Sequence, residues 1–189
     1  VVKFILPVSA GSGVDGITRA ASNQLAAALG TSLVIENQPG AGGVVGTQAL
    51  VKAAPDGQTL SMVSNNHVIY PSVLKSLPFD PINDITPICV VGATPMVLVV
   101  NPGLPVNSLK EFVALLKANP GKYNFASVGN GSSSHLTMEY LKSLTGTFAV
   151  HIPFNGGPPA VLSTSSGDTQ ILATVPTVIA PQVAAGRMK

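Results

Sequence analysis

Tryptophan is absent from this sequence, and charged side chains are scarce. Only 10% of the 189 residues are Asp, Glu, Lys or Arg, compared with about 25% in an average globular protein. The formal net charge is +2, and the few basic residues form no cluster. Because nucleic-acid-binding proteins carry basic patches and stacking aromatic side chains, we expect no nucleic-acid partner.

Cysteine occurs once, at Cys89, so the sequence allows no internal disulfide and no cluster of cysteine metal ligands. The apolar run around it predicts a buried core residue and not a nucleophile. Histidines are scattered singly without zinc-site spacing, and we expect no metal and no cofactor. Apolar runs such as Met96–Val100 are much shorter than the roughly 18 residues of a membrane span, which predicts a soluble chain.

Short apolar runs alternate with segments of helical periodicity in the first half of the chain. Strands are expected at Val1–Leu6, Leu33–Glu36 and Thr59–Ser64, and helices around 17–29, 44–53 and 70–76, with a polar loop at 65–67. This alternation is typical of a parallel α/β sheet, in which ligands bind beyond the carboxyl ends of the strands. We therefore expect the loops after the three strands to lie at one edge of a sheet.

A proline-rich segment, Leu77–Pro105, separates this half from a second one of similar pattern. Strands are expected at Tyr123–Ser127, Phe148–Phe154 and Gln170–Thr174, and helices from Ser108, near 136–144, near 159–165 and at 177–185. Ser108 and Glu111 have the spacing of a capping box. The repeated order predicts two α/β domains, 1–98 and 99–189.

The stretch Ala126–His135 passes from a strand through a Gly/Ser turn into a helix. Glycines allow close approach to the backbone, and the N–H groups of a helix start favour a carboxylate or phosphate. From these residues alone, a well-capped turn and an anion cradle both remain open.

A second glycine-rich loop carries an enzyme-like motif. Gly11–Gly16 matches G-x-G-x-x-G, and Glu36 follows about 20 residues later, as in dinucleotide-binding folds. Pro7–Ala10 separate the motif from its strand, and Asp15 would place a negative charge beside a pyrophosphate. A nicotinamide-dinucleotide-dependent oxidoreductase is therefore the alternative function. Asp15 either stabilises the helix start or meets a ligand ammonium.

Hydrolase chemistry has little support in the sequence. No G-x-S-x-G motif occurs, and Ser132 with His135 on one helix lacks an obvious carboxylate to orient the histidine. We expect a protein that is not an enzyme.

Four segments strongly resemble the Bug family, the TctC-like extracytoplasmic receptors of tripartite tricarboxylate transporters. They are Glu36–Gly43, Ala54–Leu60, Leu77–Pro81 and Gly129–Leu136. The resemblance runs along the whole chain. It implies a two-domain α/β periplasmic-binding-protein fold (Venus flytrap, type II) whose C-terminal return segment is missing. It also implies a periplasmic protein that binds a small carboxylate or amino-acid ligand in an interdomain cleft and delivers it to membrane permease subunits. A flytrap sensor module is the other possibility.

In the family, two loops hold the ligand carboxylate with main-chain N–H groups and hydroxyls. The corresponding ligand-binding residues are Ser9, Ala10, Gly11, Ser12 and Gly13 in one loop, and Ser127, Gly129, Asn130, Gly131, Ser132, Ser133 and His135 in the other. Ser64, Asn65, Phe154, Asn155 and Gly156 would line the cleft.

Overall fold

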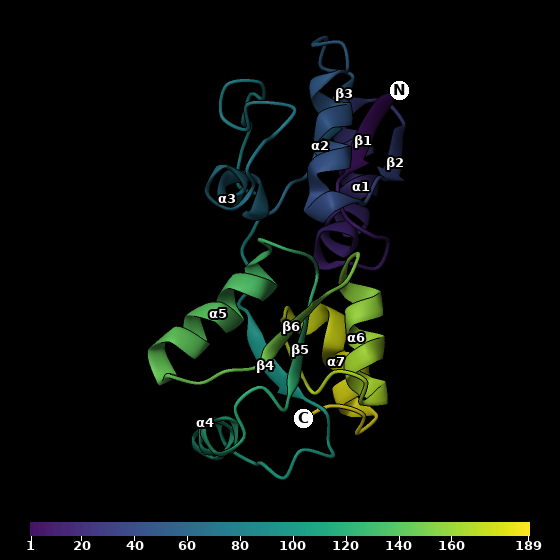
Figure 1. The fold of residues 1–189 in the computed structure, drawn as a ribbon. Coiled ribbons are helices and arrows are strands. Elements are labelled where there is room, and N and C mark those ends of the chain that lie inside the picture. Colours follow the sequence, from purple (N-terminus) through teal and green to yellow (C-terminus); the bar gives the residue numbers. More distant parts are fainter. The chain divides into compact units, whose positions relative to one another are not determined.

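The computed structural model describes residues 1–189 and divides them into two compact units, Val1–Gly92 and Ala93–Lys189. Each unit has its own β-sheet with helices packed against it (Figure 1). The predicted domain ranges, 1–98 and 99–189, stay a prediction. They would divide strand β4 (Val97–Val100), which lies entirely within the second unit. None of the helices combines the length and the apolar character needed to cross a membrane.

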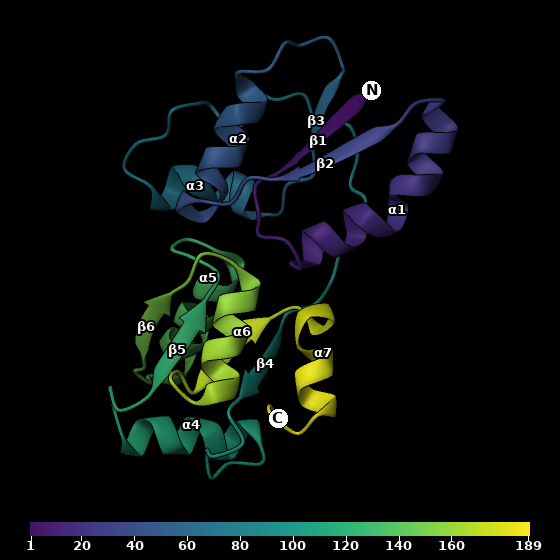
Figure 2. The same cartoon turned by 90° about the vertical axis from the view of Figure 1, so that its right-hand side faces the viewer.

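The first unit is built on a three-stranded parallel sheet with the strand order β2-β1-β3 (Figure 2). Its elements are β1 (Val2–Leu6), α1 (Gly13–Leu29), β2 (Leu33–Asn37), η1 (Ala41–Gly43), α2 (Val44–Val51), β3 (Thr59–Ser61) and α3 (Asn66–Val73). In the central strand, Lys3 pairs with Val34 on one side and with Thr59 on the other. Because all three strands run the same way, the loops that follow them lie at one edge, as predicted.

Helix α2 packs closely against the end of β1. Phe4, Ile5 and Leu6 of that strand are buried. A Cβ atom added at Gly46 would lie only 2.7 Å from the Pro7 Cα and from the Gln38 carbonyl oxygen. The absence of a side chain at Gly46 therefore allows the helix to approach this closely.

The prediction for the segment after β3 is wrong in its boundaries. Asn66 and His67 belong to α3, which ends at Val73, and do not form a loop before a helix at 70–76. Pro71 lies inside α3, and a proline within a helical pattern normally indicates a helix end. The ring of Tyr70 instead anchors the helix, since its hydroxyl donates to the Gly42 carbonyl at 2.8 Å.

Cys89 is exposed, so the prediction of a buried core cysteine is wrong. No strand forms in the apolar run from Ile85 to Val91, and Val90 is 90% exposed. Pro87 lies in the middle of this run and lacks the N–H group that a strand would donate to its neighbour. Apolar composition alone therefore did not make this segment part of a core.

The second unit has a four-stranded sheet with the order β4-β7-β5-β6. Its further elements are α4 (Leu109–Ala118), β5 (Asn124–Ser127), α5 (Ser133–Thr145), β6 (Val150–Pro153), α6 (Gly157–Ser166), β7 (Ile171–Thr174) and α7 (Pro176–Ala184). β5 is parallel to both β6 and β7, as the alternating pattern predicts. β4 runs antiparallel to β7, so the expectation of an entirely parallel sheet fails at this edge.

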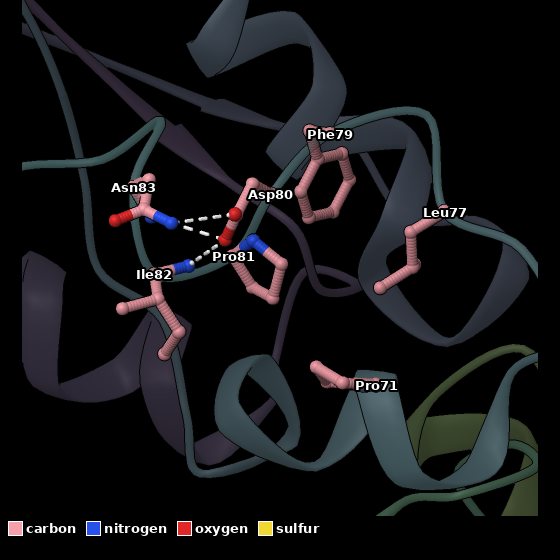
Figure 3. A pocket seen from close by; sticks show the side chains of 7 residues that line it. All are labelled: Pro71, Leu77, Phe79, Asp80, Pro81, Ile82 and Asn83. Atoms are coloured by element: carbon pink, nitrogen blue, oxygen red, sulfur yellow. Dashed lines mark hydrogen bonds between the residues drawn. The ribbon is translucent and has the colours of Figure 1, made fainter.

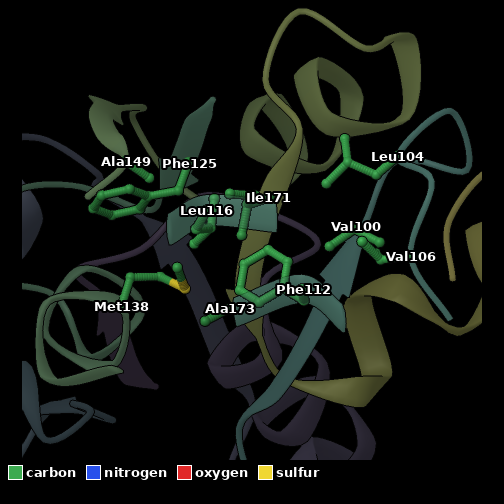
Figure 4. Close-up of a cluster of buried hydrophobic side chains, with 10 residues drawn as sticks. All are labelled: Val100, Leu104, Val106, Phe112, Leu116, Phe125, Met138, Ala149, Ile171 and Ala173. Atoms are coloured by element: carbon green, nitrogen blue, oxygen red, sulfur yellow. The ribbon is translucent and has the colours of Figure 1, made fainter. Parts of the chain in front are cut away.

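Helices cover both faces of this second sheet, α5 on one side and α6 on the other (Figure 1). Side chains alternate between the faces along β7: Ile171 and Ala173 belong to one buried cluster, and Leu172 to the other. The first cluster also contains Phe112 of α4 and Met138 of α5 (Figure 4). Burial on both faces explains why β7 reads as a continuous apolar run.

Candidate functional site

Two loops, Ser9–Gly13 in the first unit and Gly129–Ser133 in the second, have the same local structure. Each connects a strand to a helix whose N-cap is a serine. The Oγ atom of Ser12 accepts a hydrogen bond from the Asp15 N–H at 3.3 Å, and that of Ser132 accepts one from the His135 N–H at 3.2 Å. The cap serines thereby satisfy one N–H group of each helix start.

A glycine before each cap completes the shared structure. Gly11 (φ 78°) and Gly131 (φ 72°) adopt a left-handed conformation that favours glycine. The Gly11 N–H donates to the Asp15 carboxylate at 2.9 Å, and the Gly131 N–H donates to His135 Nδ1 at 3.1 Å. In both loops the acceptor side chain is therefore four residues after the glycine.

The partner of that acceptor side chain has opposite charge in the two loops. Arg19 Nε lies 2.9 Å from Asp15 Oδ1, and Glu139 Oε1 lies 3.7 Å from His135 Nε2. Both pairs have the i, i+4 spacing of neighbours on one helix face. The same backbone structure is thus stabilised by an anion in the first loop and by an imidazole in the second.

Asp15 links the first loop to strand β2. Its Oδ1 atom accepts from Asn37 Nδ2 at 3.0 Å, and that amide also donates to the Val8 carbonyl at 3.2 Å. Burial raises the pKa of Asp15, but the hydrogen bonds from Arg19, Gly11 and Asn37 outweigh it and bring the pKa below 3.8. Asp15 therefore has the structural role, and it is not available to a ligand ammonium.

These contacts also argue against the dinucleotide alternative. The Gly11 N–H already binds the carboxylate of Asp15, where a pyrophosphate would need a donor. Glu36 Oε2 forms an ion pair with Lys3 at 2.7 Å and accepts from Gln38 Nε2 at 3.2 Å, so this carboxylate already has partners on its own sheet. The motif residues serve the fold of the loop.

The first loop leads into the start of α1, where the first N–H groups have no acceptor within the helix. Ala10 and Gly11 are exposed, and the Ser12 N–H donates to the Ser9 carbonyl at 3.2 Å. The N–H groups of Gly13 and Val14, the first two of α1, have no acceptor within the helix. Unpaired N–H groups at a helix start suit an anion.

In the second loop, the serine hydroxyls are used internally. Ser127 and Ser132 are fully buried. Ser132 Oγ donates to the Gly129 carbonyl at 2.6 Å, and Ser127 Oγ accepts from the Gly129 N–H at 3.2 Å. Asn130 is exposed at the tip of the turn. The hydroxyls of these two buried serines are therefore used within the loop, as is the Gly129 N–H.

Two stacked imidazoles lie beside this second loop. The rings of His135 and His151 are 3.9 Å apart and nearly parallel, at an angle of 7°. The Phe125 ring stacks on His151 at 4.8 Å. His151 Nε2 is 2.6 Å from Ser127 Oγ. Both histidines therefore contact the loop, His135 through the Gly131 amide and His151 through Ser127.

Both histidines are held in the neutral form at neutral pH. Burial lowers the pKa of His151 to about 4, with a further contribution from the adjacent His135. Burial also lowers the pKa of His135, against the opposing effect of Glu139. The Ser127–His151 pair does not form a hydrolase nucleophile, since Ser127 is buried and Glu139 lies next to the other histidine.

The remaining predicted residues lie after β3 and β6. Ser64 and Asn65 accept hydrogen bonds from the first turn of α3 through their carbonyls. The Phe154 N–H donates to the Ser127 carbonyl at 3.0 Å, and its ring packs on a core cluster. Asn155 is exposed, and Gly156 caps α6. Because β5 and β6 are parallel neighbours, 154–156 and the Gly129 loop lie at the same sheet edge.

A separate hollow of about 570 Å³ lies on the first unit (Figure 3). Leu77, Phe79 and Pro81 supply much of its apolar lining. The Asp80 carboxylate is used within its own turn, where it accepts from the Ile82 N–H at 2.8 Å and from Asn83 Nδ2 at 2.6 Å. None of the predicted ligand-binding residues lines this hollow.

Sequence reasoning missed three residues that support the loops: Arg19, Asn37 and His151. The i, i+4 spacing of Asp15 and Arg19 was a signal for the first of them. Asn37 and His151 reach the loops from neighbouring strands, β2 and β6. Their roles depend on strand pairing, which the sequence does not specify residue by residue.

The sequence model of the tripartite tricarboxylate transporter family receptor (TctC) matches residues 17–189. The BugT protein of Bordetella pertussis is 37% identical over 168 residues, which are 88% of this chain and 52% of BugT. The chain therefore spans about half the length of the curated relatives it matches.

Solved structures of periplasmic binding proteins match the whole chain. BugD superposes with a TM-score of 0.93 at 29% identity, over 100% of this chain and 63% of BugD. R. palustris Rpa4515 with adipate superposes with a TM-score of 0.96 at 25% identity, over 100% of this chain and 63% of Rpa4515. MatC from Rhodopseudomonas palustris with bound malate superposes with a TM-score of 0.91 at 27% identity, over 100% of this chain and 65% of MatC. The predicted α/β binding-protein fold is confirmed.

Proposed function

Because the chain belongs to the tripartite tricarboxylate transporter receptor (TctC/Bug) family, we propose that it binds a small carboxylate-bearing solute and is not an enzyme. The observation that carries the proposal is the pair of equivalent loops, each presenting backbone N–H groups at a helix start. The bound adipate and malate in related structures support a carboxylate ligand.

Backbone donors alone are sufficient for such a ligand. Hydrogen bonds to a charged group contribute about 1.5–3 kcal/mol each, and micromolar affinity corresponds to about −8 kcal/mol. We propose that Ser9–Gly13 and Gly129–Ser133 supply these donors. His135, Ser64–Asn65 and Phe154–Gly156 complete the proposed site.

Calorimetry with malate, adipate, other dicarboxylates and amino acids tests the proposal on this chain. A pair of variants at Gly13 identifies the donor. Gly13→Pro removes an N–H at the first helical position, where proline is well tolerated, and Ser12 (φ −72°, ψ 166°) already has the extended conformation that precedes proline. Gly13→Ala keeps the N–H and serves as the control.

We expect Gly13→Pro to weaken binding about 10- to 100-fold, which corresponds to one charge-assisted hydrogen bond. Gly13→Ala should remain within a few-fold of the unsubstituted chain. Circular dichroism establishes that both variants are folded. No heat with any member of the panel, or the same loss in both variants, would contradict the proposal.

We further propose that the protein acts in the periplasm and delivers its solute to membrane permease subunits. Family membership supports this assignment. Co-purification with a permease from detergent-solubilised membranes, increased by the solute, is the expected result. Recovery of a signalling protein in place of a permease would favour a sensor module.

A further inference from the structure

The second loop depends on an unprotonated nitrogen. The Gly131 N–H donates to His135 Nδ1 at 3.1 Å, so Nδ1 must carry a lone pair and the proton of the neutral ring lies on Nε2. In the first loop the equivalent acceptor is a carboxylate that is already ionised at all pH values above its lowered pKa. Only the second loop therefore depends on a neutral imidazole, whose acceptor nitrogen is lost when the ring is protonated.

His151 adds a second connection to the same loop. Its Nε2 is 2.6 Å from Ser127 Oγ, which also accepts the Gly129 N–H at 3.2 Å. The two stacked rings thus contact the two loop glycines, His135 directly and His151 through Ser127.

We propose that the stacked pair His135–His151 is a proton-sensitive latch: it holds the Gly129–Gly131 loop while both rings are neutral and releases it when His135 is protonated. His151 is a positioning residue in this latch, since it contacts Ser127 Oγ and stacks on the His135 ring. As a control of solute binding, the latch rests on the proposed function of the loop. The effect of His135 protonation on the structure of the loop does not depend on that function.

Charged groups around the pair come from one helix. Glu139 and Lys142 of α5 face the rings, whereas β5 contributes the uncharged Phe125 and Ser127. Glu139 favours the imidazolium form of His135, but its carboxylate is engaged by Lys142 Nζ at 2.7 Å. Burial and Lys142 oppose protonation of His135, and burial, His135 and Lys142 oppose protonation of His151, which leaves both rings neutral near pH 7.

Protonation of His135 has two geometric consequences. The new Nδ1–H would face the Gly131 N–H, and two donors at 3.1 Å do not form a hydrogen bond. A charged His135 would also lie 3.9 Å from the His151 ring, so charging of both rings is opposed by repulsion. The loop must therefore lose the Gly131 bond as the pH falls through the pKa of His135.

Nuclear magnetic resonance of the isotope-labelled 189-residue chain, titrated from pH 7.5 to 4.5, tests the latch without any ligand. We expect the Nε2–H tautomer of His135 at pH 7.5, and Gly131 amide shifts that follow the His135 midpoint. His151→Phe keeps a stacked ring but removes the contact with Ser127 Oγ, so the Gly129 amide should shift at every pH while the Gly131 transition still follows the His135 midpoint.

Glu139→Gln should move the His135 midpoint and the Gly131 transition to lower pH, because it removes the charge that favours imidazolium. Glu111→Gln, an exposed glutamate on α4, is the matched control and should move neither. A Gly131 amide that does not respond while His135 titrates would overturn the proposal. So would a His135 midpoint that is unchanged in Glu139→Gln.

Solute affinity, measured over the same pH range, should fall about tenfold per pH unit below the His135 midpoint, in proportion to the neutral fraction. This drop in affinity should move with the His135 midpoint in each variant. The ligand's own ionisation is the same for all variants, so it does not account for such a difference. A solute affinity that does not change at the His135 midpoint would overturn the latch as a control of binding. Absence of binding at every pH contradicts the proposed function, and the ligand-free titration still decides the latch.

Discussion

The contacts of Asp15 predict a large loss of stability when its side chain is truncated. The Asp15 side chain is only 5% exposed and accepts hydrogen bonds from Gly11, Asn37 and Arg19. Bonds to a charged group contribute about 1.5–3 kcal/mol each. The Arg19 contribution is smaller, below about 1 kcal/mol, because that side chain is half exposed. Water can also replace the lost acceptor at the exposed Gly11.

We therefore expect Asp15→Ala to reduce the free energy of unfolding by about 2–4 kcal/mol. Asp15→Asn keeps an acceptor oxygen for the Gly11 N–H and should lose about 1–2 kcal/mol. Urea unfolding followed by circular dichroism measures both values. Asp56→Ala is the control: Asp56 accepts only the Gln58 N–H in an exposed turn, and its loss should stay within about 1 kcal/mol.

The pH dependence provides an independent check on Asp15. Its pKa in the folded protein lies below 3.8, so its ionised form stabilises the fold fully above that pH. This contribution disappears as the pH falls through the folded-state pKa. The difference in stability between the unsubstituted chain and Asp15→Asn should therefore shrink below pH 3.8. A difference that is negligible at pH 7, or that is constant with pH, would refute the assigned role of Asp15.

Three further predictions concern packing, capping and exposure. Gly46→Ala places a Cβ 2.7 Å from the Pro7 and Gln38 backbones and should destabilise by about 1–3 kcal/mol in urea unfolding; unchanged stability would contradict the close packing of α2. Ser132→Ala removes a buried N-cap that also donates to Gly129 and should lower stability by about 1–2 kcal/mol, seen as a lower unfolding midpoint. Cys89 should react with a thiol reagent in the native protein as fast as a free thiol, and protection until unfolding would show that it is covered.

Local signals made much of the fold predictable. The Gly/Ser turn after β5 was expected to lead into a helix, and Ser132 caps that helix. Ser108 was identified as a helix start from residue type and spacing, and its side chain accepts the expected N–H bond of Glu111. Even there a detail differs: the Glu111 carboxylate accepts from Asn107 and not from Ser108. Periodicity located β7 and its neighbours because a strand buried on both faces reads as an apolar run.

Predictions that depended on distant contacts were less successful. The antiparallel direction of β4 follows from its pairing with β7, which periodicity does not specify. Cys89 was expected in the core from its apolar neighbours, but a proline nearby prevents a strand. Both candidate loops were located from sequence, whereas their support by Asn37 and His151 arises from adjacent strands. The sequence therefore predicts local backbone structure better than the side chains that stabilise it.

The central position of β7 has a consequence for the dynamics of the second unit. All four of its residues are buried, and it lies between β4 and β5, with helices covering both faces. Exchange of its amide hydrogens with solvent requires both layers to separate, so these amides should exchange by global opening of the unit. At the sheet edge, β6 has a strand on one side only and can open locally. The strand that carries His151 can therefore move while the centre of the unit stays intact.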